Sequence, residues 1–376
     1  MRESRILTDR QTERNYGIDL FRIVSMLMVV TLHILGHGAD IWSQEYGTTS
    51  YAALWLFEAI SLCAVNCYAL ISGYVGIKSK FKVSNLLYLW VQVTVYTITI
   101  TLVFKIVHPE SVSKLDVIKA FFPVFTEQYW YFTSYFILFL FIPLLNNAVE
   151  HISKIKMGVL LLALVIAVSG VAPLFNTMFG GDVFIINGGY SAWWLMILYL
   201  IGAFLSKHQI IHNVKKRFLL LAFLLSAILT WLSKVLLPIV ENQLFGEVRY
   251  SDVLVNYTSI TVLFSSVSLL LLFERLSVGL NLKRIIAFLS PLCFGVYLIH
   301  ENPLIRKYCI SGRFVFLNTN NVLIMALCII GCAISILALC SLLDLFRFWL
   351  FRLIRLKPAL LKVELRVRNN KNSLVK

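Results

Sequence analysis

Ten apolar runs of about 20 residues follow one another along the 376-residue chain, with short polar breaks between them. A helix needs about 20 mostly apolar residues to cross the roughly 30 Å hydrocarbon core of a bilayer. The composition agrees, since 59% of the residues are hydrophobic and only 14% are charged. The sequence therefore predicts an all-α, multi-pass protein of the cell membrane. The ten spans are expected near residues 17–36, 51–74, 83–107, 130–149, 157–174, 190–206, 217–238, 253–273, 285–304 and 321–345.

The first run lies where a secretory signal would lie, but no small-x-small cleavage site precedes the next span, so we expect it to be retained. No Pro/Gly/Ser-rich linker, aligned repeat or soluble module is visible. We therefore expect one membrane domain over 1–376. Its core is expected at 15–350, with a cytoplasmic segment at 1–14 and a basic cytoplasmic tail at 346–376.

The distribution of Lys and Arg predicts the orientation, because basic residues accumulate in short cytoplasmic segments. With ten spans and the N-terminus inside, 25 of the 34 Lys and Arg residues fall on the cytoplasmic side, so both termini are expected there. This bias accounts for the net charge of +15. Binding to nucleic acid would require a basic patch on a soluble face, which the sequence does not show, so nucleic acid is excluded as a partner. The stretch 346–362 predicts an amphipathic helix on the inner leaflet, with plain stop-transfer charges as the alternative.

Three outside segments are long enough to touch a substrate: 106–128, which contains a candidate short interfacial helix, 175–189 and 239–252. The seven Cys residues show no metal-type CxxC pairing and are interpreted as small apolar packing residues.

Two ionisable residues in the first span point to chemistry, because such residues are costly in lipid and usually face a polar cavity. Arg22 and His33 are eleven positions apart, which returns them to within about 20° of the same helix face. Their separation along the axis is roughly 16 Å, with Arg22 toward the inner end and His33 toward the outer end. This stripe suits a phosphate-bearing donor inside and a hydroxyl acceptor outside. The structural alternatives are that Arg22 snorkels to the inner interface or pairs with Asp19, and that His33 caps a polar helix end.

Five ordered segments resemble the acyltransferase-3 family of integral membrane acyltransferases over roughly residues 15–350. The first is YGIDLFRIVSMLMVVTLH, which contains Arg22 and His33. The others are VNCYALISGY ending in Ser72, Gly73 and Tyr74; Tyr129-Trp130-Tyr131 with Pro143-Leu144-Leu145-Asn146; SAWWLMILYLIGAFL around Tyr199 and Gly202; and the stretch from Ser290 to His300 that ends in Tyr-Leu-Ile-His.

The resemblance implies transfer of an acyl group, commonly acetyl, from an acyl-CoA such as acetyl-CoA to a hydroxyl of a cell-surface polysaccharide or other envelope glycan. His33 is the expected general base or acyl relay. His300 and Glu301 end the ninth span on the same side and are expected to contact the acceptor or orient the imidazole, with a structural role as the alternative for His300. Glu58 is a further catalytic candidate, although it could instead pair with a cation or stay protonated.

The expected donor site departs from the family pattern, because KSKFKVSNLL stands where many relatives carry Arg-x-x-Arg. Lys78, Lys80 and Lys82 would then supply point charges to the CoA phosphates beside Arg22, or serve as ordinary inside-loop charges. His33 and His37 have metal-ligand spacing, but no third ligand is nearby in sequence, so no metal is expected.

Two other classes compete with this function. A transporter or flippase for an envelope glycan or lipid-linked intermediate would show paired Gly/Pro interruptions, and no convincing pair is found. A different membrane acyl-transfer superfamily is disfavoured by the position of Arg22 and His33 near the N-terminus. The expected partners are the acyl-CoA, the glycan acceptor and the lipid bilayer, and the sequence is compatible with a homo-oligomer.

Overall fold

The computed structural model describes residues 14–209 and 213–374, with side chains described as far as residue 369. This part of the chain is built from helices and contains no strand. The membrane-type helices are α1 (Tyr16–His33), α2 (Thr49–Ser61) with α3 (Ala64–Gly76), α4 (Val83–Val107), α6 (Trp130–His151), α7 (Lys154–Val165) with α8 (Ala172–Phe179), α9 (Ala192–His208), α10 (Lys216–Phe245), α11 (Ile260–Glu274), α12 (Leu280–Leu289) with α13 (Cys293–His300), and α15 (Val322–Leu353). The short helices α5 (Lys114–Phe121) and α14 (Pro303–Ile305) and the C-terminal α16 (Leu356–Leu374) complete the set.

The expected spans are confirmed as helices. Within the described residues, eight helical segments are long and apolar enough to cross a membrane, and the shorter apolar helices α9 and α11 coincide with the sixth and eighth expected spans. The chain is therefore an all-α, multi-pass membrane protein of about ten spans. The short helix expected between 106 and 128 is α5, which begins with a capping box between Ser113 and Asp116.

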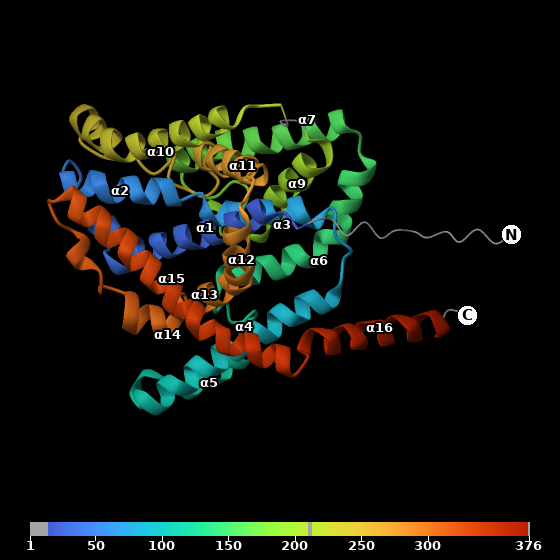
Figure 1. Ribbon diagram of the computed structural model, residues 1–376. Coiled ribbons are helices and arrows are strands. Elements are labelled where there is room, and N and C mark those ends of the chain that lie inside the picture. Colours follow the sequence, from blue (N-terminus) through green and yellow to red (C-terminus); the bar gives the residue numbers. More distant parts are fainter. Residues whose placement is uncertain (1–13, 210–212, 375–376) are drawn as a thin grey trace.

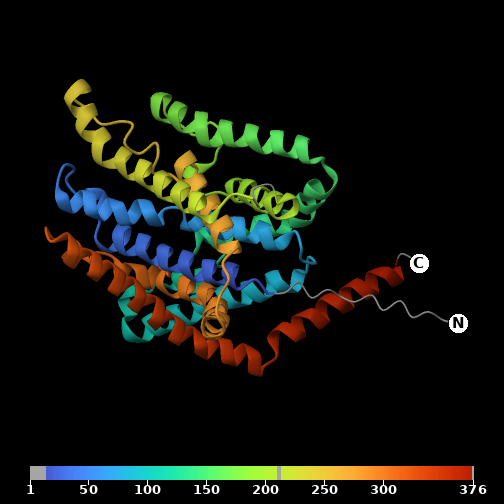
Figure 2. The same cartoon turned by 45° about the horizontal axis from the view of Figure 1, so that its top comes forward.

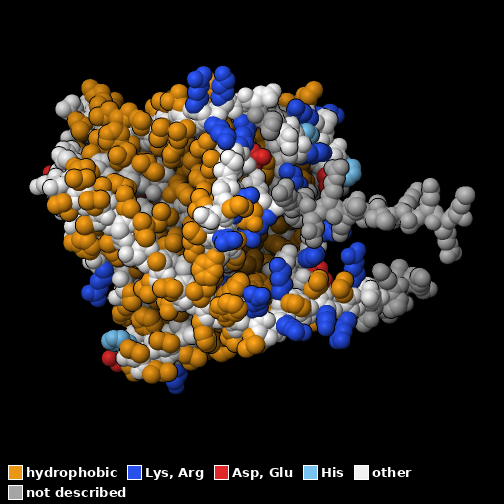
Figure 3. Space-filling view, viewed as in Figure 1, with side chains coloured by type: hydrophobic (Ala, Val, Ile, Leu, Met, Phe, Trp, Pro, Cys, Tyr) orange, Lys and Arg blue, Asp and Glu red, His pale blue; other side chains and the backbone are white. Residues whose placement is uncertain are grey.

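Helix α1 lies in the middle of the bundle, where it contacts α2, α3, α11, α13 and α15. Figure 2 shows α7 and α10 on one side of it and α4 and α15 on the other. Successive spans run in alternating directions, and α16 extends from the end of the bundle at which α1 begins (Figure 1). We call this end the Arg22 end and the opposite one the His33 end. In Figure 3, Lys and Arg side chains gather toward the Arg22 end, while the opposite part of this face is largely hydrophobic.

Helices α3 and α9 pack backbone against backbone. A Cβ added at Gly73 would lie 2.0 Å from the Tyr199 carbonyl oxygen, and one added at Gly202 would lie 2.2 Å from the Leu70 carbonyl oxygen. Small residues allow such close approach between membrane helices, where packing rather than the hydrophobic effect drives association. The glycines in the Ser-Gly-Tyr and Leu-Ile-Gly segments are therefore explained by this contact.

Two spans are broken. The second bends at Leu62 and Cys63, between α2 and α3, where the sequence carries no Gly or Pro. The ninth is interrupted by a 3₁₀ turn at Ser290–Leu292 that contains Pro291, which cannot donate a backbone hydrogen bond. The backbone of α1 also widens into a π-helix over Ile34–Gly38, directly after His33. Such π segments occur frequently at functional sites.

Three expectations about segment boundaries are wrong. Residues 175–179 belong to α8 and residues 239–245 to α10, so both outside loops are shorter than expected. The stretch 346–362 is not one helix, because α15 continues to Leu353 and α16 begins at Leu356, after a turn in which Arg355 has a φ of 51°. Residues 346–353 are largely apolar and continue the last span, so the C-terminal tail begins after residue 353 and not at residue 346.

Helix α16 is fixed to the start of α4. The Glu364 carboxylate accepts hydrogen bonds from the backbone N–H groups of Val83 and Ser84, at 2.9 and 3.0 Å. Partial burial opposes the charged form of Glu364, but hydrogen bonds from Ser84 and Val83 and the nearby Lys82 hold its pKa below the ordinary value. A carboxylate at this position also complements the positive N-terminal end of the helix dipole.

Candidate active site

One face of α1 lines a series of hollows that extends from the Arg22 end toward the His33 end. Arg22 lines two hollows of about 410 and 210 Å³. Met26 and Val29, one and two turns further along, line a narrow central hollow of about 60 Å³ together with His33. His33 also lines a fourth hollow of about 260 Å³, which we call the reaction cavity. The expected common stripe of Arg22 and His33 is thus observed.

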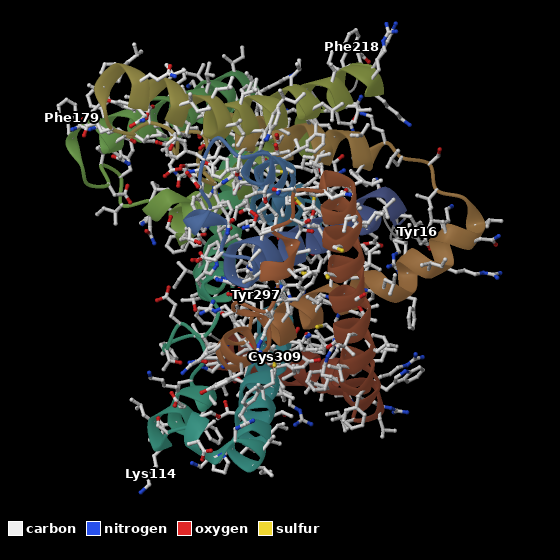
Figure 4. All side chains as sticks on the ribbon, turned by 90° about the vertical axis from the view of Figure 1, so that its left-hand side faces the viewer. Tyr16, Lys114, Phe179, Phe218, Tyr297 and Cys309 are labelled. Atoms are coloured by element: carbon white, nitrogen blue, oxygen red, sulfur yellow. The ribbon has the colours of Figure 1, made fainter. Side chains whose placement is uncertain are left out.

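The central hollow is walled by aromatic rings. Tyr68, Trp130, Tyr131 and Tyr297 face the α1 stripe, and the last of these lies near the middle of the bundle when it is viewed from the His33 end (Figure 4). Tyr68 is anchored by a 2.6 Å hydrogen bond that its hydroxyl donates to the Arg22 carbonyl oxygen. The Tyr131 hydroxyl is buried and has no hydrogen-bond partner among the described residues. A buried, unpaired hydroxyl is costly and marks a place where a ligand group could be received.

His33 is held by residues at the end of the ninth span. Its Nδ1 atom lies 2.9 Å from Nε2 of His300 and 3.1 Å from Oε2 of Glu301. The His33 side chain is 16% exposed and that of Glu301 is 5% exposed. The structure therefore brings together three of the predicted catalytic residues, two of which are more than 260 positions away from His33 in sequence.

The hydrogen-bond pattern determines where the protons lie. His300 Nδ1 is 2.6 Å from the Val296 carbonyl oxygen, which can only accept, so Nδ1 carries the proton. The Nε2 atom of a neutral His300 is then an acceptor, and His33 must donate to it through Nδ1. This leaves Nε2 of a neutral His33 without a proton. Nε2 also has no hydrogen-bond partner among the described residues, so it is available as a base.

Glu301 is held by Arg306, whose Nη1 atom forms an ion pair with Oε1. The other carboxylate oxygen remains directed at His33 and would stabilise an imidazolium formed there. Arg306 is not among the residues that the sequence predicts for this site. The only signal was a basic residue five positions after Glu301, next to a helix end.

No third metal ligand was expected near His33 and His37, but the fold brings one there. His33, His37 and Glu301 each offer a ligand atom, and these atoms lie within 4.8 Å of one another. Two of these groups already have other partners, since Glu301 pairs with Arg306 and Nδ1 of His33 lies 2.9 Å from Nε2 of His300. The expectation of no metal stays a prediction.

Glu58, in α2, lines the reaction cavity together with His33. Its side chain is buried, and Oε2 has no hydrogen-bond partner among the described residues. Pairing with a cation, the alternative considered from sequence, is not observed among the described residues. Glu58 is therefore a second ionisable side chain at the reaction cavity, with one carboxylate oxygen that has no partner among the described residues.

The basic residues expected at the donor end lie around Arg22. Lys78 lines the larger hollow, and Lys80 and Lys82 line the smaller one. Arg22 itself forms an ion pair with Asp19, as the alternative reading expected, yet its side chain remains 31% exposed. Asp19 is shared with Arg14, so the Arg22 end has a cationic excess around an accessible opening.

A largely buried imidazole whose Nε2 carries no proton, next to hollows that extend toward a basic end of a membrane bundle, suits a group-transfer reaction. The sequence model of a family described as an acyltransferase domain matches residues 15–340. The chain therefore belongs to the acyltransferase-3 family, and it is a membrane acyltransferase. No curated protein and no solved structure gives a significant match to the chain.

Proposed function

We propose that this protein transfers an acyl group, and specifically acetyl, from cytoplasmic acyl-CoA to a hydroxyl of a cell-surface polysaccharide or other envelope glycan. The observation that carries this proposal is the position of His33, which lines both the central hollow and the reaction cavity. A donor arriving from the Arg22 end and an acceptor entering from the His33 end would meet at this side chain.

The Arg22 end is proposed to face the cytoplasm. This orientation follows from the accumulation of Lys and Arg at that end, since cytoplasmic segments of membrane proteins are enriched in these residues. Arg22, Lys78, Lys80 and Lys82 would hold the CoA phosphates. The central hollow, at about 60 Å³, is narrower than a thioester arm requires, so donor binding has to displace aromatic side chains such as Tyr131.

The proposed reaction uses His33 as a general base. Nε2 accepts the proton of the acceptor hydroxyl while its oxygen bonds to the thioester carbonyl carbon, and the carbon–sulfur bond then breaks. The proton passes from the imidazolium to the departing CoA sulfur, so CoA leaves as the thiol. Glu301 stabilises the imidazolium, and His300 keeps the ring in the required tautomer. A relay in which the acyl group rests on His33 would use the same nitrogen.

The proposal is tested on the envelope itself. Surface polysaccharides from cells with and without the protein are compared by mass spectrometry, and we expect one acetyl mass per modified sugar only when the protein is present. A larger acyl mass would correct the donor but preserve the enzyme class. Identical polysaccharide spectra would contradict the proposed glycan acceptor.

Replacement of Arg22 tests the donor end. Arg22→Ala is expected to raise KM for acetyl-CoA by about 10–100-fold, because hydrogen bonds to charged groups contribute about 1.5–3 kcal/mol. Arg22→Lys keeps the charge but loses the planar fork, so a smaller increase is expected. The matched control is Arg217→Ala, because Arg217 is exposed and basic but lines neither of the two hollows beside Arg22, which we call the donor hollows. If the Arg22→Ala enzyme had the donor KM of the control, Arg22 would be only an interfacial anchor.

A further inference from the structure

A further hollow, also of about 260 Å³, lies beside the reaction cavity at the His33 end. It is formed where α8 and the loop after it meet the segment before α11, and Phe179, the last residue of α8, marks the edge of this region in Figure 4. We call it the polar pocket. Its polar lining consists of Asn176, Thr177, Asp182, Asn187, Asn256 and Thr258.

The polar pocket and the reaction cavity share a wall. Asn256 lines both hollows. The next residue, Tyr257, lines the reaction cavity, as does Tyr190, which follows the polar-pocket loop. The two hollows therefore adjoin at Asn256.

Aromatic rings form the part of the reaction cavity nearest to this wall. The Trp130 ring stacks on Tyr257 with a centroid distance of 6.1 Å and an interplanar angle of 16°, and it lies 4.5 Å from the Tyr190 ring. The faces of such rings carry partial negative charge and attract C–H groups that bear partial positive charge. Sugar rings present such C–H faces and place their hydroxyls around the edge.

The polar pocket offers neutral hydrogen-bonding groups and, among the described residues, no cationic side chain. Within the part of the chain that the structure describes, its lining contains no Lys or Arg, and Asp182 is the one acidic residue in it. The side-chain amide of Asn187 and the hydroxyl of Thr258 form no hydrogen bond within the described residues. Asn176 uses its carbonyl oxygen to accept from the Val183 N–H at 3.1 Å, which leaves its NH₂ group free to donate. This chemistry fits a neutral, polyhydroxylated ligand and disfavours a phosphate or carboxylate.

The loop that forms the pocket has an unusual backbone. Ile185 and Asn187 have φ values of 53° and 51°, in the left-handed region that side chains other than Gly rarely occupy. Asp182 accepts a hydrogen bond from the Asn187 N–H and so holds this conformation. Left-handed residues other than Gly cluster at ligand sites, where the surrounding structure maintains a costly backbone.

We propose that the polar pocket is an acceptor subsite that binds the sugar unit next to the one acylated at His33. The acceptor is then a glycan chain of at least two units, and the pocket selects chains over single sugars. This inference rests on the proposed glycan acylation.

The test compares a long and a short acceptor. Membranes that contain the protein are supplied with radiolabelled acetyl-CoA and either oligosaccharides released from the host's own surface polysaccharide or a methyl glycoside of a single constituent sugar. The test variant combines Asn187→Gly, which removes the amide and tolerates the positive φ, with Thr258→Val, which removes the hydroxyl at nearly constant volume. The control is Gln243→Ala, an exposed polar residue on α10 that lines neither hollow.

We expect the double variant to raise KM for the oligosaccharide about 10-fold, since each lost neutral hydrogen bond is worth a few-fold in affinity. KM for the methyl glycoside and for acetyl-CoA should match those of the control. An unchanged oligosaccharide KM would overturn the subsite, and so would an equal loss for both acceptors, which would indicate a general structural role. A wild-type protein that acylates neither acceptor would instead refute the proposed glycan acylation, and that result is visible before any variant is compared.

Discussion

His33→Gln is expected to lower the rate of acyl transfer by about 10²–10⁴-fold, the usual contribution of a general base. Glutamine can retain a hydrogen bond to His300 but cannot carry a proton from the acceptor hydroxyl to the leaving sulfur, as the proposed reaction requires. His33→Ala should be similarly inactive. Donor binding should survive in both variants, because Arg22, at the centre of the expected donor site, lies roughly 16 Å from His33 along α1.

The measurement is transfer of labelled acetyl to the envelope glycan in membranes with matched protein levels, together with equilibrium binding of acetyl-CoA. His108→Gln is the matched control, because His108 is also at the His33 end but is exposed and stacks on Tyr308. Wild-type glycan modification by either His33 variant would remove His33 from the mechanism. Loss of donor binding as well as transfer would point to a collapsed bundle instead.

Periodicity was sufficient to place Arg22 and His33, because both lie on one regular helix whose face can be calculated from 3.6 residues per turn. The hollows along that face could not be predicted from the sequence, because they depend on the tertiary structure. Aromatic residues that line the central hollow come from α3, α6, α13 and the segment before α11, and no spacing rule relates these elements.

The contacts that His33 makes could likewise not be predicted from sequence spacing alone. His300 and Glu301 were placed on the correct side by counting spans, but the tautomer of His33 follows only from the distances to His300 Nε2 and Val296 O. The third potential metal ligand was missed for the same reason, since Glu301 reaches His37 only through the fold. The break between α2 and α3 at Leu62 could not be foreseen, because neither Gly nor Pro marks it.

The contact between α3 and α9 gives the second large expected effect. Gly202→Ala would place a methyl carbon 2.2 Å from the Leu70 carbonyl oxygen and 3.0 Å from the Tyr74 backbone nitrogen. Backbone atoms cannot rotate away as a side chain can, so the two helices would have to separate. Overpacking of this kind typically costs about 1–3 kcal/mol. We therefore expect a lower unfolding temperature in detergent and a lower yield of folded protein.

Gly331→Ala is the control, because Gly331 lies inside α15 and an added Cβ would have no atom within 4 Å other than those of its own helix backbone. There the higher helix propensity of Ala should stabilise by up to about 1 kcal/mol, so the two substitutions should change stability in opposite directions. Equal stability of the two variants would show that α3 and α9 can separate without cost.

Gly73→Ala should resemble Gly202→Ala, since its Cβ would meet the Tyr199 carbonyl oxygen at 2.0 Å in the same interface. The double variant should be less destabilised than the sum of the two single variants, because one separation of the helices accommodates both methyl groups. Tyr74 and Gly76, at the end of α3, line the two donor hollows, so the same separation should also raise KM for acetyl-CoA. Additive stability losses with an unchanged donor KM would mean that the two glycines act independently and that α3 does not shape the donor site through this contact.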